Sequence, residues 1–407
     1  MKKIDGGVTA AKGFEAAATA AGIKYRGRTD MALIYSEAPC KSAGTFTTNV
    51  VKAAPVMWDK KIVASKIKTQ AIIVNSGIAN ACTGEEGYGY CAQTAQEAAK
   101  QLDVDGISVL LGSTGVIGKQ LPIETLKAGI KALAANKNGS IENGTAAAQA
   151  IMTTDTYAKE YAVEIEIEGV TVTVGGMAKG SGMIHPDMCT MLSFITTDAV
   201  ISKKTLQKAL SADVKDTYNM ISVDGDTSTN DTVLVLANGM AKNVKIEEGT
   251  QAYIDFAEAL HSVNKFLAMQ IAGDGEGATA LLEATVIGAT SKSQASVIAK
   301  SIVCSNLTKT AIAGHDANWG RILCAMGYAG EIFDPEKVDL FFESVIGKIQ
   351  IIENGTALDY SEEKATEILS QPKVTVTADL KMGEDEATAW GCDLTHGYID
   401  INADYRS

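Results

Sequence analysis

The sequence predicts a mixed α/β fold of the α+β kind, in which helices cover the sheets. Short apolar runs at residues 70–75 and 107–111 indicate buried strands. Residues 163–174 alternate between polar and apolar side chains about a central turn, which is typical of a hairpin with one exposed and one buried face. An Ala-, Gln- and Glu-rich stretch at residues 90–102 indicates a helix, and strands and helices follow each other without a regular βαβ rhythm.

Further elements are expected along the rest of the chain. A helix should follow Pro122, because proline fits the first turn of a helix. Other helices are expected at residues 203–218, 251–271, 291–302 and 361–370, and other strands at 191–197, 232–237, 279–288, 338–344, 374–379 and 398–402. The string Ile-Glu-Asn-Gly-Thr-Ala occurs at 141–146 and again at 352–357, and we interpret both copies as a turn followed by a helix-capping threonine.

The composition argues against several classes of function. With 407 residues, of which 46% are hydrophobic and 21% charged, the chain fits a globular protein of one large domain or two. A formal net charge of −13 repels phosphate backbones and anionic lipids, so we expect neither nucleic acid nor membrane as a partner. No signal-peptide core follows Lys2 and Lys3, and the seven scattered cysteines form no Cys-x-x-Cys pair. We therefore expect a cytoplasmic protein with reduced thiols and no metal site.

The most informative segment is residues 175–198, a glycine-rich stretch between two expected strands. It is not a phosphate-binding Walker loop, because Lys179 precedes Gly180-Ser181 where that motif needs Gly-Lys-Ser/Thr. On composition alone, a long flexible connection explains the segment as well as a functional site does. The residue that changes this balance is Thr190.

A threonine in such a loop can cut its own chain. Its β-hydroxyl attacks the carbonyl of the preceding residue to give an ester that water opens, which leaves a free α-amine on the same residue. That amine is a base within reach of the hydroxyl, so a threonine nucleophile of this kind needs no histidine. The chain has only four histidines, and none of them lies in a plausible triad.

The residues around Thr190 read Lys179-Gly180-Ser181-Gly182-Met183-Ile184-x-Pro186-x-Met188-x-Thr190-Met191-Leu192. This string closely resembles the self-cleavage motif of the bifunctional ornithine acetyltransferase/N-acetylglutamate synthase family of arginine biosynthesis. Similar matches run along the chain, among them residues 75–84, 112–118, 152–156, 223–231, 273–279 and 316–322. The family more often has Asn at Asp187 and Ala at Cys189, but neither departure alters the attacking threonine.

The resemblance implies a reaction and a subunit organisation. The chain would cleave itself between Cys189 and Thr190 into an α fragment, residues 1–189, and a β fragment, residues 190–407, which stay together in an α2β2 assembly. Thr190 would then take the acetyl group of N-acetylornithine as an ester and pass it to glutamate, in a ping-pong reaction. Acetyl-CoA is a further donor that the sequence leaves open, and no metal or organic cofactor is implied.

The resemblance also implies the site residues. The Thr114 side chain and the Gly115 N–H would stabilise the oxyanion, and the substrates would be bound by Thr153, Lys179, Thr190, Glu276, Asn402 and Ser407. The charges suit the task, since a lysine attracts a carboxylate and lowers the pKa of a nearby amine, and a glutamate attracts an ammonium. On the residues alone, however, Thr114-Gly115 also fits a turn at a strand end, and Lys179 and Glu276 also fit exposed loop positions.

Two other patterns resemble known motifs without meeting their requirements. The glycines at 273, 275 and 277 follow a helix and open a strand, the reverse of a dinucleotide-binding fingerprint. The Asp224–Ser228 stretch begins like a calcium loop but lacks the later glycine and glutamate, so we interpret it as a turn network.

Two competing functions remain open from the sequence. One is a self-processed N-terminal-nucleophile amidase or aminopeptidase, which would use the same ester chemistry with water as the acceptor. The other is a binding protein that kept the fold and lost the chemistry. Glu276, Asn402 and Ser407 favour an amino-acid acceptor over water, and the intact set of Thr114, Gly115, Lys179 and Thr190 argues against loss of the chemistry.

Overall fold

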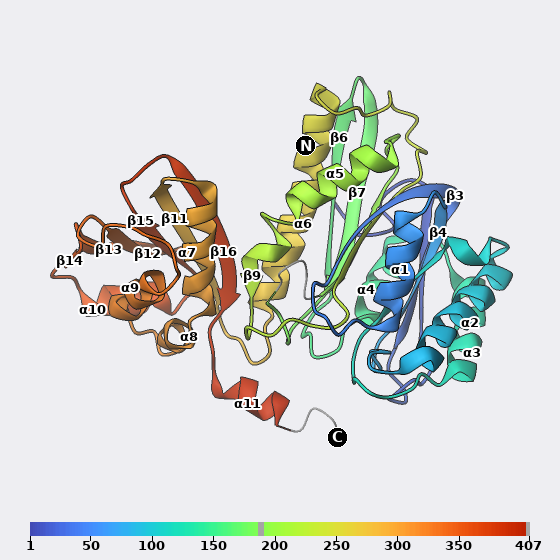
Figure 1. Cartoon of the computed structure of the whole chain (residues 1–407), viewed down its shortest axis with the longest axis horizontal. Coiled ribbons are helices and arrows are strands. Elements are labelled where there is room, and N and C mark those ends of the chain that lie inside the picture. The colour runs from blue at the N-terminus through green and yellow to red at the C-terminus, as the bar shows by residue number, and fades with distance from the viewer. Residues whose placement is uncertain (186–190, 404–407) are drawn as a thin grey trace. The chain divides into compact units, whose positions relative to one another are not determined.

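The computed structural model describes residues 1–185 and 191–403, which fall into two compact units (Figure 1). Of the described residues, the first unit holds 1–180, 191–218 and 227–267, and the second holds 181–185, 219–226 and 268–403. These units do not coincide with the two fragments expected from cleavage before Thr190. The fragment boundary concerns where the chain is cut, and it stays a prediction.

Within the described residues, the first unit is built on a nine-stranded sheet with the order β1-β6-β7-β8-β10-β3-β4-β5, in which β2 also pairs with β3. β8 and β10 run parallel, and β10 and β3 run antiparallel. The strands are β1 (Lys2–Ile4), β2 (Phe14–Thr19), β3 (Met31–Phe46), β4 (Thr69–Asn75), β5 (Val109–Ser113), β6 (Lys159–Ile167), β7 (Val170–Lys179), β8 (Leu192–Thr197) and β10 (Thr232–Ala237). The helices are α1 (Ala54–Ala64), α2 (Gly84–Leu102), α3 (Ile123–Asn136), α4 (Ile141–Ala150) and α5 (Lys203–Asp213). A further helix, α6 (Gln251–Gly273), begins in the first unit, and its residues from 268 onward belong to the second.

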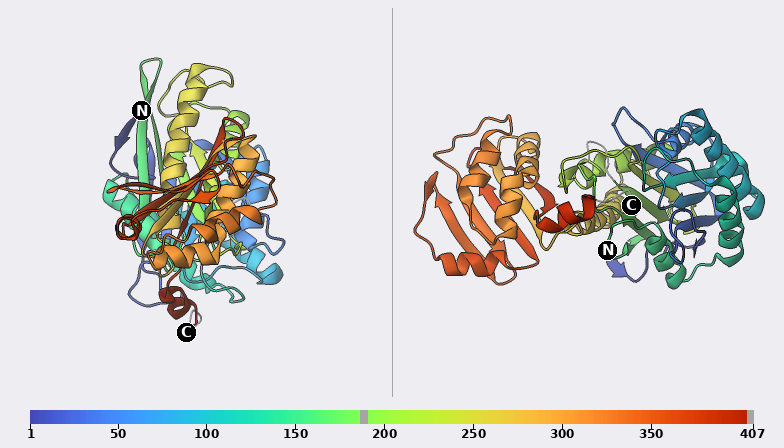
Figure 2. Two further views of the ribbon diagram at one scale, coloured as in Figure 1. Left: turned by 90° about the vertical axis from the view of Figure 1, so that its left-hand side faces the viewer. Right: turned by 90° about the horizontal axis from the view of Figure 1, so that it is seen from below.

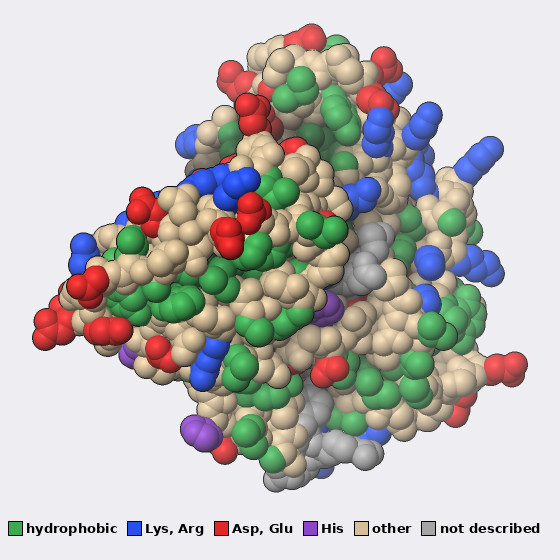
Figure 3. All heavy atoms as spheres, turned by 60° about the vertical axis from the view of Figure 1, so that its left-hand side comes forward, with side chains coloured by type: hydrophobic (Ala, Val, Ile, Leu, Met, Phe, Trp, Pro, Cys, Tyr) green, Lys and Arg blue, Asp and Glu red, His purple; other side chains and the backbone are tan. Residues whose placement is uncertain are grey.

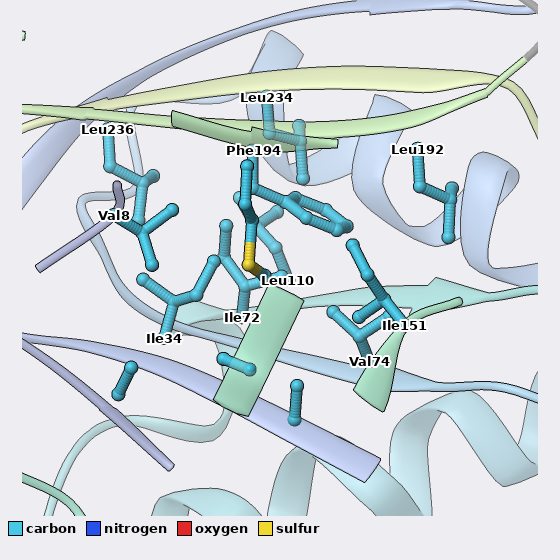
Figure 4. Close-up of a cluster of buried hydrophobic side chains, with 14 of the residues drawn as sticks. Val8, Ile34, Ile72, Val74, Leu110, Ile151, Leu192, Phe194, Leu234 and Leu236 are labelled. Carbon is cyan, nitrogen blue, oxygen red and sulfur yellow. The ribbon is translucent and has the colours of Figure 1, made fainter. Parts of the chain in front are cut away.

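The main core of the first unit lies where two parts of this sheet face each other. Figure 4 shows Phe194 of β8 and Leu234 of β10 packed opposite Ile34, Ile72 and Leu110 from β3, β4 and β5. All five side chains are fully buried, and removing them from water stabilises the unit. The opposite face of β3, β4 and β5 forms a second cluster with α2 and α3. This double packing fixes the strand ends that carry the candidate site.

Within the described residues, the second unit has a seven-stranded sheet with the order β14-β13-β12-β15-β11-β16-β9. α7 (Lys292–Cys304) packs against β11 and β16 (Figure 2). The strands are β9 (Ile221–Ser222), β11 (Leu281–Ala289), β12 (Asp339–Ser344), β13 (Gly347–Glu353), β14 (Thr356–Ala357), β15 (Lys373–Asp379) and β16 (Asp385–Cys392). The other helices are α8 (Asn306–Ala313), α9 (Trp319–Gly327), α10 (Glu362–Leu369) and α11 (His396–Asn402).

The predicted fold class is confirmed, and most expected elements are present. The hairpin expected at 163–174 is β6–β7, and its turn uses positive φ at Glu168 and Gly169. The strand expected at 398–402 is wrong, because these residues lie in α11. This helix begins where the Thr395 side chain accepts a hydrogen bond from the Gly397 N–H, and none of its residues is buried. The alternation of Ile399 and Ile401 with polar residues therefore does not mark a buried strand face.

Two other expectations are corrected by the structure. The helix expected at 203–218 ends at Asp213. The two copies of the repeated hexapeptide have different structures: the first lies inside α4, which Ser140 caps, and the second forms the turn between β13 and β14. In neither copy does the threonine cap a helix, because Ser140 already caps the first copy's helix and the second is part of a hairpin.

The surface carries interspersed acidic and basic side chains (Figure 3). In the part of the chain that the structure describes, no helix combines the length and the apolar character that crossing a bilayer requires. The cysteines of that part, Cys40, Cys82, Cys91, Cys304, Cys324 and Cys392, form no disulfides. Residues 1–185 and 191–403 also contain no group of three or more His, Cys, Asp or Glu side chains arranged to hold a metal ion.

Candidate active site

Lys179, at the end of β7, is the centre of a polar cluster in the first unit. Its side chain is 9% exposed. Nζ donates to Thr153 Oγ1 at 2.8 Å and to Thr114 Oγ1 at 3.5 Å. Three residues that the sequence singled out therefore lie together, although they come from a strand end, a loop and the segment after β5. The alternative interpretation of Lys179, an exposed loop residue with no binding role, does not fit its buried side chain.

Asp155 holds this lysine in place. Its Oδ2 lies 3.9 Å from Lys179 Nζ, and its Oδ1 accepts hydrogen bonds from Lys159 Nζ and from the Gly180 N–H, both at 2.8 Å. Burial alone would raise the pKa of Asp155, but the charges of Lys179 and Lys159 and its hydrogen bonds hold that pKa far below its usual range. Asp155 therefore stays ionised at neutral pH. No role for Asp155 could be read from the sequence, where only its position two residues after Thr153 hinted at one.

The segment after β5 makes a tight turn at Gly115. The Thr114 N–H donates to the Asn75 carbonyl at 3.0 Å, and Gly115 has φ +125°. A Cβ at Gly115 would lie 2.3 Å from the carbonyl carbon of Gly77, so only glycine fits. This turn at the end of β5 brings the Thr114 hydroxyl to Lys179.

The hydrogen bond from Lys179 orients the hydroxyl of Thr114. An ammonium can only donate hydrogen bonds, so Thr114 Oγ1 accepts from Lys179 and its own hydrogen can be donated elsewhere. Asn230 supports the same turn, since its Nδ2 donates to the carbonyls of Ala79 and Ser113, both at 2.7 Å. An O–H donor beside a glycine N–H is suited to a developing oxyanion.

In the second unit, Glu276 and Asn402 form a pair. Asn402 Nδ2 donates to Glu276 Oε2 at 2.7 Å, and the Glu276 N–H donates to the Ser181 carbonyl at 3.0 Å. Glu276 is only 7% exposed. A Cβ on Gly182 would lie 2.2 Å from Oε2, so this glycine leaves room for the carboxylate. Glu276 is therefore not on an exposed turn.

The residues that precede the expected cut are held by Asp224. Its Oδ2 accepts from the Met183 N–H at 2.6 Å, and its Oδ1 accepts from the Ile184 N–H at 2.9 Å. The Asp226 N–H also donates to Oδ1, at 3.2 Å, which confirms Asp224 as part of a turn network. Thr190, Cys189, Asp187 and Ser407 lie outside the described residues.

The fold and the groups at the end of β7 are suited to an enzyme site for a small polar substrate, because a buried cation and hydroxyls are means of binding and polarising such a molecule. Comparison with known proteins identifies the family. The ArgJ family model matches residues 15–407, and the chain belongs to the ArgJ family.

Two relatives named for the family are similar along nearly the whole chain, and a solved structure is similar along about half of it. The arginine biosynthesis bifunctional protein ArgJ of Thermotoga neapolitana is 51% identical over 397 residues, which are 97% of this chain and 99% of that protein. The protein of the same name from Caldanaerobacter subterraneus subsp. tengcongensis is 51% identical over 407 residues, which are 100% of this chain and 100% of that protein. The crystal structure of ArgJ from Bacillus halodurans is 46% identical, covers 53% of this chain and 99% of its own chain, and has a TM-score of 0.51.

These matches confirm the resemblance noted from the sequence. The chain is an acyltransferase of arginine biosynthesis, a glutamate N-acetyltransferase.

Proposed function

We propose that the chain cleaves itself between Cys189 and Thr190 and then transfers the acetyl group of N-acetylornithine to glutamate through an acetyl ester on Thr190. The observation that carries this proposal is the cluster of Lys179, Thr153 and Thr114 at the end of β7. The strand leads directly into the segment that contains Thr190. Ester formation is favoured by groups that stabilise an oxyanion, and a hydroxyl and a buried cation can do this.

In the cleavage step, Thr190 Oγ attacks the carbonyl carbon of Cys189. The C–N bond breaks, the nitrogen takes the proton that Oγ gives up, and an ester joins Cys189 to Thr190. Water then hydrolyses the ester, which leaves a carboxylate on Cys189 and an amine and a hydroxyl on Thr190. No cofactor is needed for this sequence of bonds.

In the transfer step, Thr190 Oγ attacks the acetyl carbonyl while the Thr190 amine takes its proton. The Thr114 hydroxyl and the Gly115 N–H donate to the oxyanion, ornithine leaves with the proton, and the amine of glutamate attacks the ester in turn. Lys179 and Thr153 bind the carboxylate of either substrate, and Glu276, Asn402 and Ser407 complete the binding of the amino acid. The relatives are named bifunctional, and we take acetyl-CoA to be a second acetyl donor.

The proposed fragments, residues 1–189 and 190–407, stay associated as an α2β2 assembly. The Bacillus halodurans relative supports a cut near the middle, because its solved chain aligns over 99% of its own length with only 53% of this one. Each proposed fragment has close to half of the 407 residues.

Intact mass spectrometry of the denatured protein tests the proposal, before and after a brief incubation with N-acetylornithine and no acceptor. We expect two fragments divided between Cys189 and Thr190, of which the second gains one acetyl group that glutamate removes. Fragments that never become acetylated would favour the amidase or aminopeptidase alternative. A single unacetylated chain would contradict both the cut and the covalent intermediate.

Replacing Glu276 with Gln should impair the use of the amino acid and leave cleavage intact. The substitution keeps the shape of the side chain beside Gly182 but removes the negative charge, so kcat/KM for glutamate should fall about tenfold or more. Steady-state kinetics at varied glutamate concentrations measure the effect. Glu283→Gln is the matched control, since Glu283 lies on β11, its side chain is 16% exposed, and it pairs with Lys373 of β15 at 2.9 Å. Equal kinetics in the two variants would remove Glu276 from the site.

A further inference from the structure

A basic groove in the first unit lies outside the site described above. It has a volume of about 710 Å³ and is bounded by α1, α5 and the end of β3. Four lysines line it, which are Lys60 of α1 and Lys203, Lys204 and Lys208 of α5. Among the described residues that line the groove, none is acidic. In a chain with a formal net charge of −13, a groove whose charged groups are all cations indicates an anionic ligand.

The groove also has an apolar lining. Phe46 of β3 and Val63 of α1 are 8% and 7% exposed. Gln207 fixes α5 to the same strand, because its Oε1 accepts from the Gly44 N–H at 3.0 Å and its Nε2 donates to the Gly44 carbonyl at 3.1 Å. A fixed aromatic and aliphatic surface beside cations suits a ligand that carries a flat apolar group as well as phosphate groups.

Helix stability does not explain where two of these lysines lie. Lys203 and Lys204 occupy the first turn of α5, which has no acidic residue, and the helix dipole disfavours cations there. Lys203 Nζ donates to the Ser65 carbonyl, which holds this ammonium where α1 ends and α5 begins. Lys208, further along α5, pairs with Glu248. A phosphate group beside Lys203 could accept from the other donors of its ammonium, which offers three in all.

Helix α1 relates the groove to the candidate active site. Its C-terminal end lines the groove, and its other end begins beside the turn that carries Thr114. There the Ala53 N–H donates to the Thr229 carbonyl at 2.9 Å. The next residue, Asn230, donates to the Ser113 carbonyl at 2.7 Å. The 11 residues of α1 rise about 16 Å between these two ends, so a ligand that joined them would be long, with its phosphate groups far from its reacting group.

We propose that this groove binds the nucleotide end of acetyl-CoA, with its phosphate groups on Lys203 and Lys204 and its adenine ring against Phe46 and Val63. The inference rests on the proposed use of acetyl-CoA as a second acetyl donor, and it names the binding site. Acetyl-CoA carries a diphosphate, a further phosphate and an aromatic base at one end and the acetyl thioester at the other, joined by a long flexible arm. N-acetylornithine has no phosphate group and therefore does not need the groove.

Titration calorimetry of the whole protein with CoA tests the proposal without turnover, because CoA carries no acetyl group. We expect CoA to bind, and its Kd to rise with salt concentration, because salt screens the lysines. Dephospho-CoA, which lacks one phosphate, should bind about tenfold more weakly, and pantetheine, which lacks them all, should not bind at the same concentrations. Inorganic pyrophosphate that binds as tightly as CoA would overturn the proposal, because the groove would then be a general anion site.

The double variant Lys203→Gln/Lys204→Gln removes two positive charges and keeps both side chains long. The Kd for CoA and the KM for acetyl-CoA should each rise about tenfold or more, while kcat/KM for N-acetylornithine should stay at the wild-type value. Lys2→Gln/Lys3→Gln is the matched control. It makes the same change in net charge at two exposed positions of β1, in the same unit, and should leave all three quantities unchanged.

Ala64 tests the place of the ligand without removal of a lysine. It is an exposed residue at the end of α1 that lines the groove, so Ala64→Lys should tighten CoA binding and Ala64→Glu should weaken it, each by about threefold. This pair decides if the double variant does not fold. The proposal is overturned if the wild-type protein does not bind CoA, or if the groove variants bind it like the Lys2→Gln/Lys3→Gln control. Because calorimetry needs neither self-cleavage nor acetyl transfer, it decides on the groove even if the wild-type protein fails in both.

Discussion

Thr190→Ala yields a single uncut chain with no acetyl transfer. The substitution removes the only atom that we propose to attack the Cys189 carbonyl, so neither the ester nor the free amine can form. The loss should be complete in both reactions, because one hydroxyl serves both. Denaturing electrophoresis and intact mass measure the cut, and the transfer of acetyl groups from N-acetylornithine to glutamate measures the catalysis.

Thr190→Ser is the control for this experiment. Serine keeps the β-hydroxyl and loses only a methyl group, so the chain should still be cut and should retain transfer activity at a reduced rate. Two fragments in Thr190→Ala would contradict the proposed cleavage site. An uncut but fully active Thr190→Ala protein would contradict the proposed nucleophile.

The sequence predicted the local features of the fold well and the distant ones poorly. The β6–β7 hairpin was evident from its alternation, since that pattern depends only on neighbouring residues. The strand expected at residues 398–402 was wrong, because a cap at Thr395 starts a short exposed helix there. The 16-residue β3, which joins both parts of the first sheet, was not predicted, because its small and polar residues are buried by tertiary contacts.

In the candidate site, too, the features that depend on contacts between distant residues could not be predicted from the sequence. Resemblance identified Thr114, Thr153 and Lys179, and the structure brings these three together across a long stretch of chain. The resemblance could not reveal that Asp155 fixes the lysine. That role arises from burial and from neighbours that only the folded chain supplies, since an aspartate in a sequence is most often exposed.

Thr114→Val should lower kcat by about 10²–10³-fold with little change in KM. Valine has nearly the shape of threonine but cannot donate to the oxyanion. Lys179 should stay in place, because it keeps its bond to Thr153 at 2.8 Å and its approach to Asp155 at 3.9 Å. Binding of the substrate carboxylate should therefore survive, and the loss should appear in the transition state alone.

Steady-state kinetics on the cut protein separate these effects. Thr94→Val is the matched control, since Thr94 is a buried threonine whose hydroxyl donates to the Tyr90 carbonyl within α2. It should change stability without changing kcat. A rise in KM at constant kcat in Thr114→Val would assign Thr114 to substrate binding. The oxyanion would then rest on the Gly115 N–H, whose direction is set by a backbone conformation that only glycine can adopt.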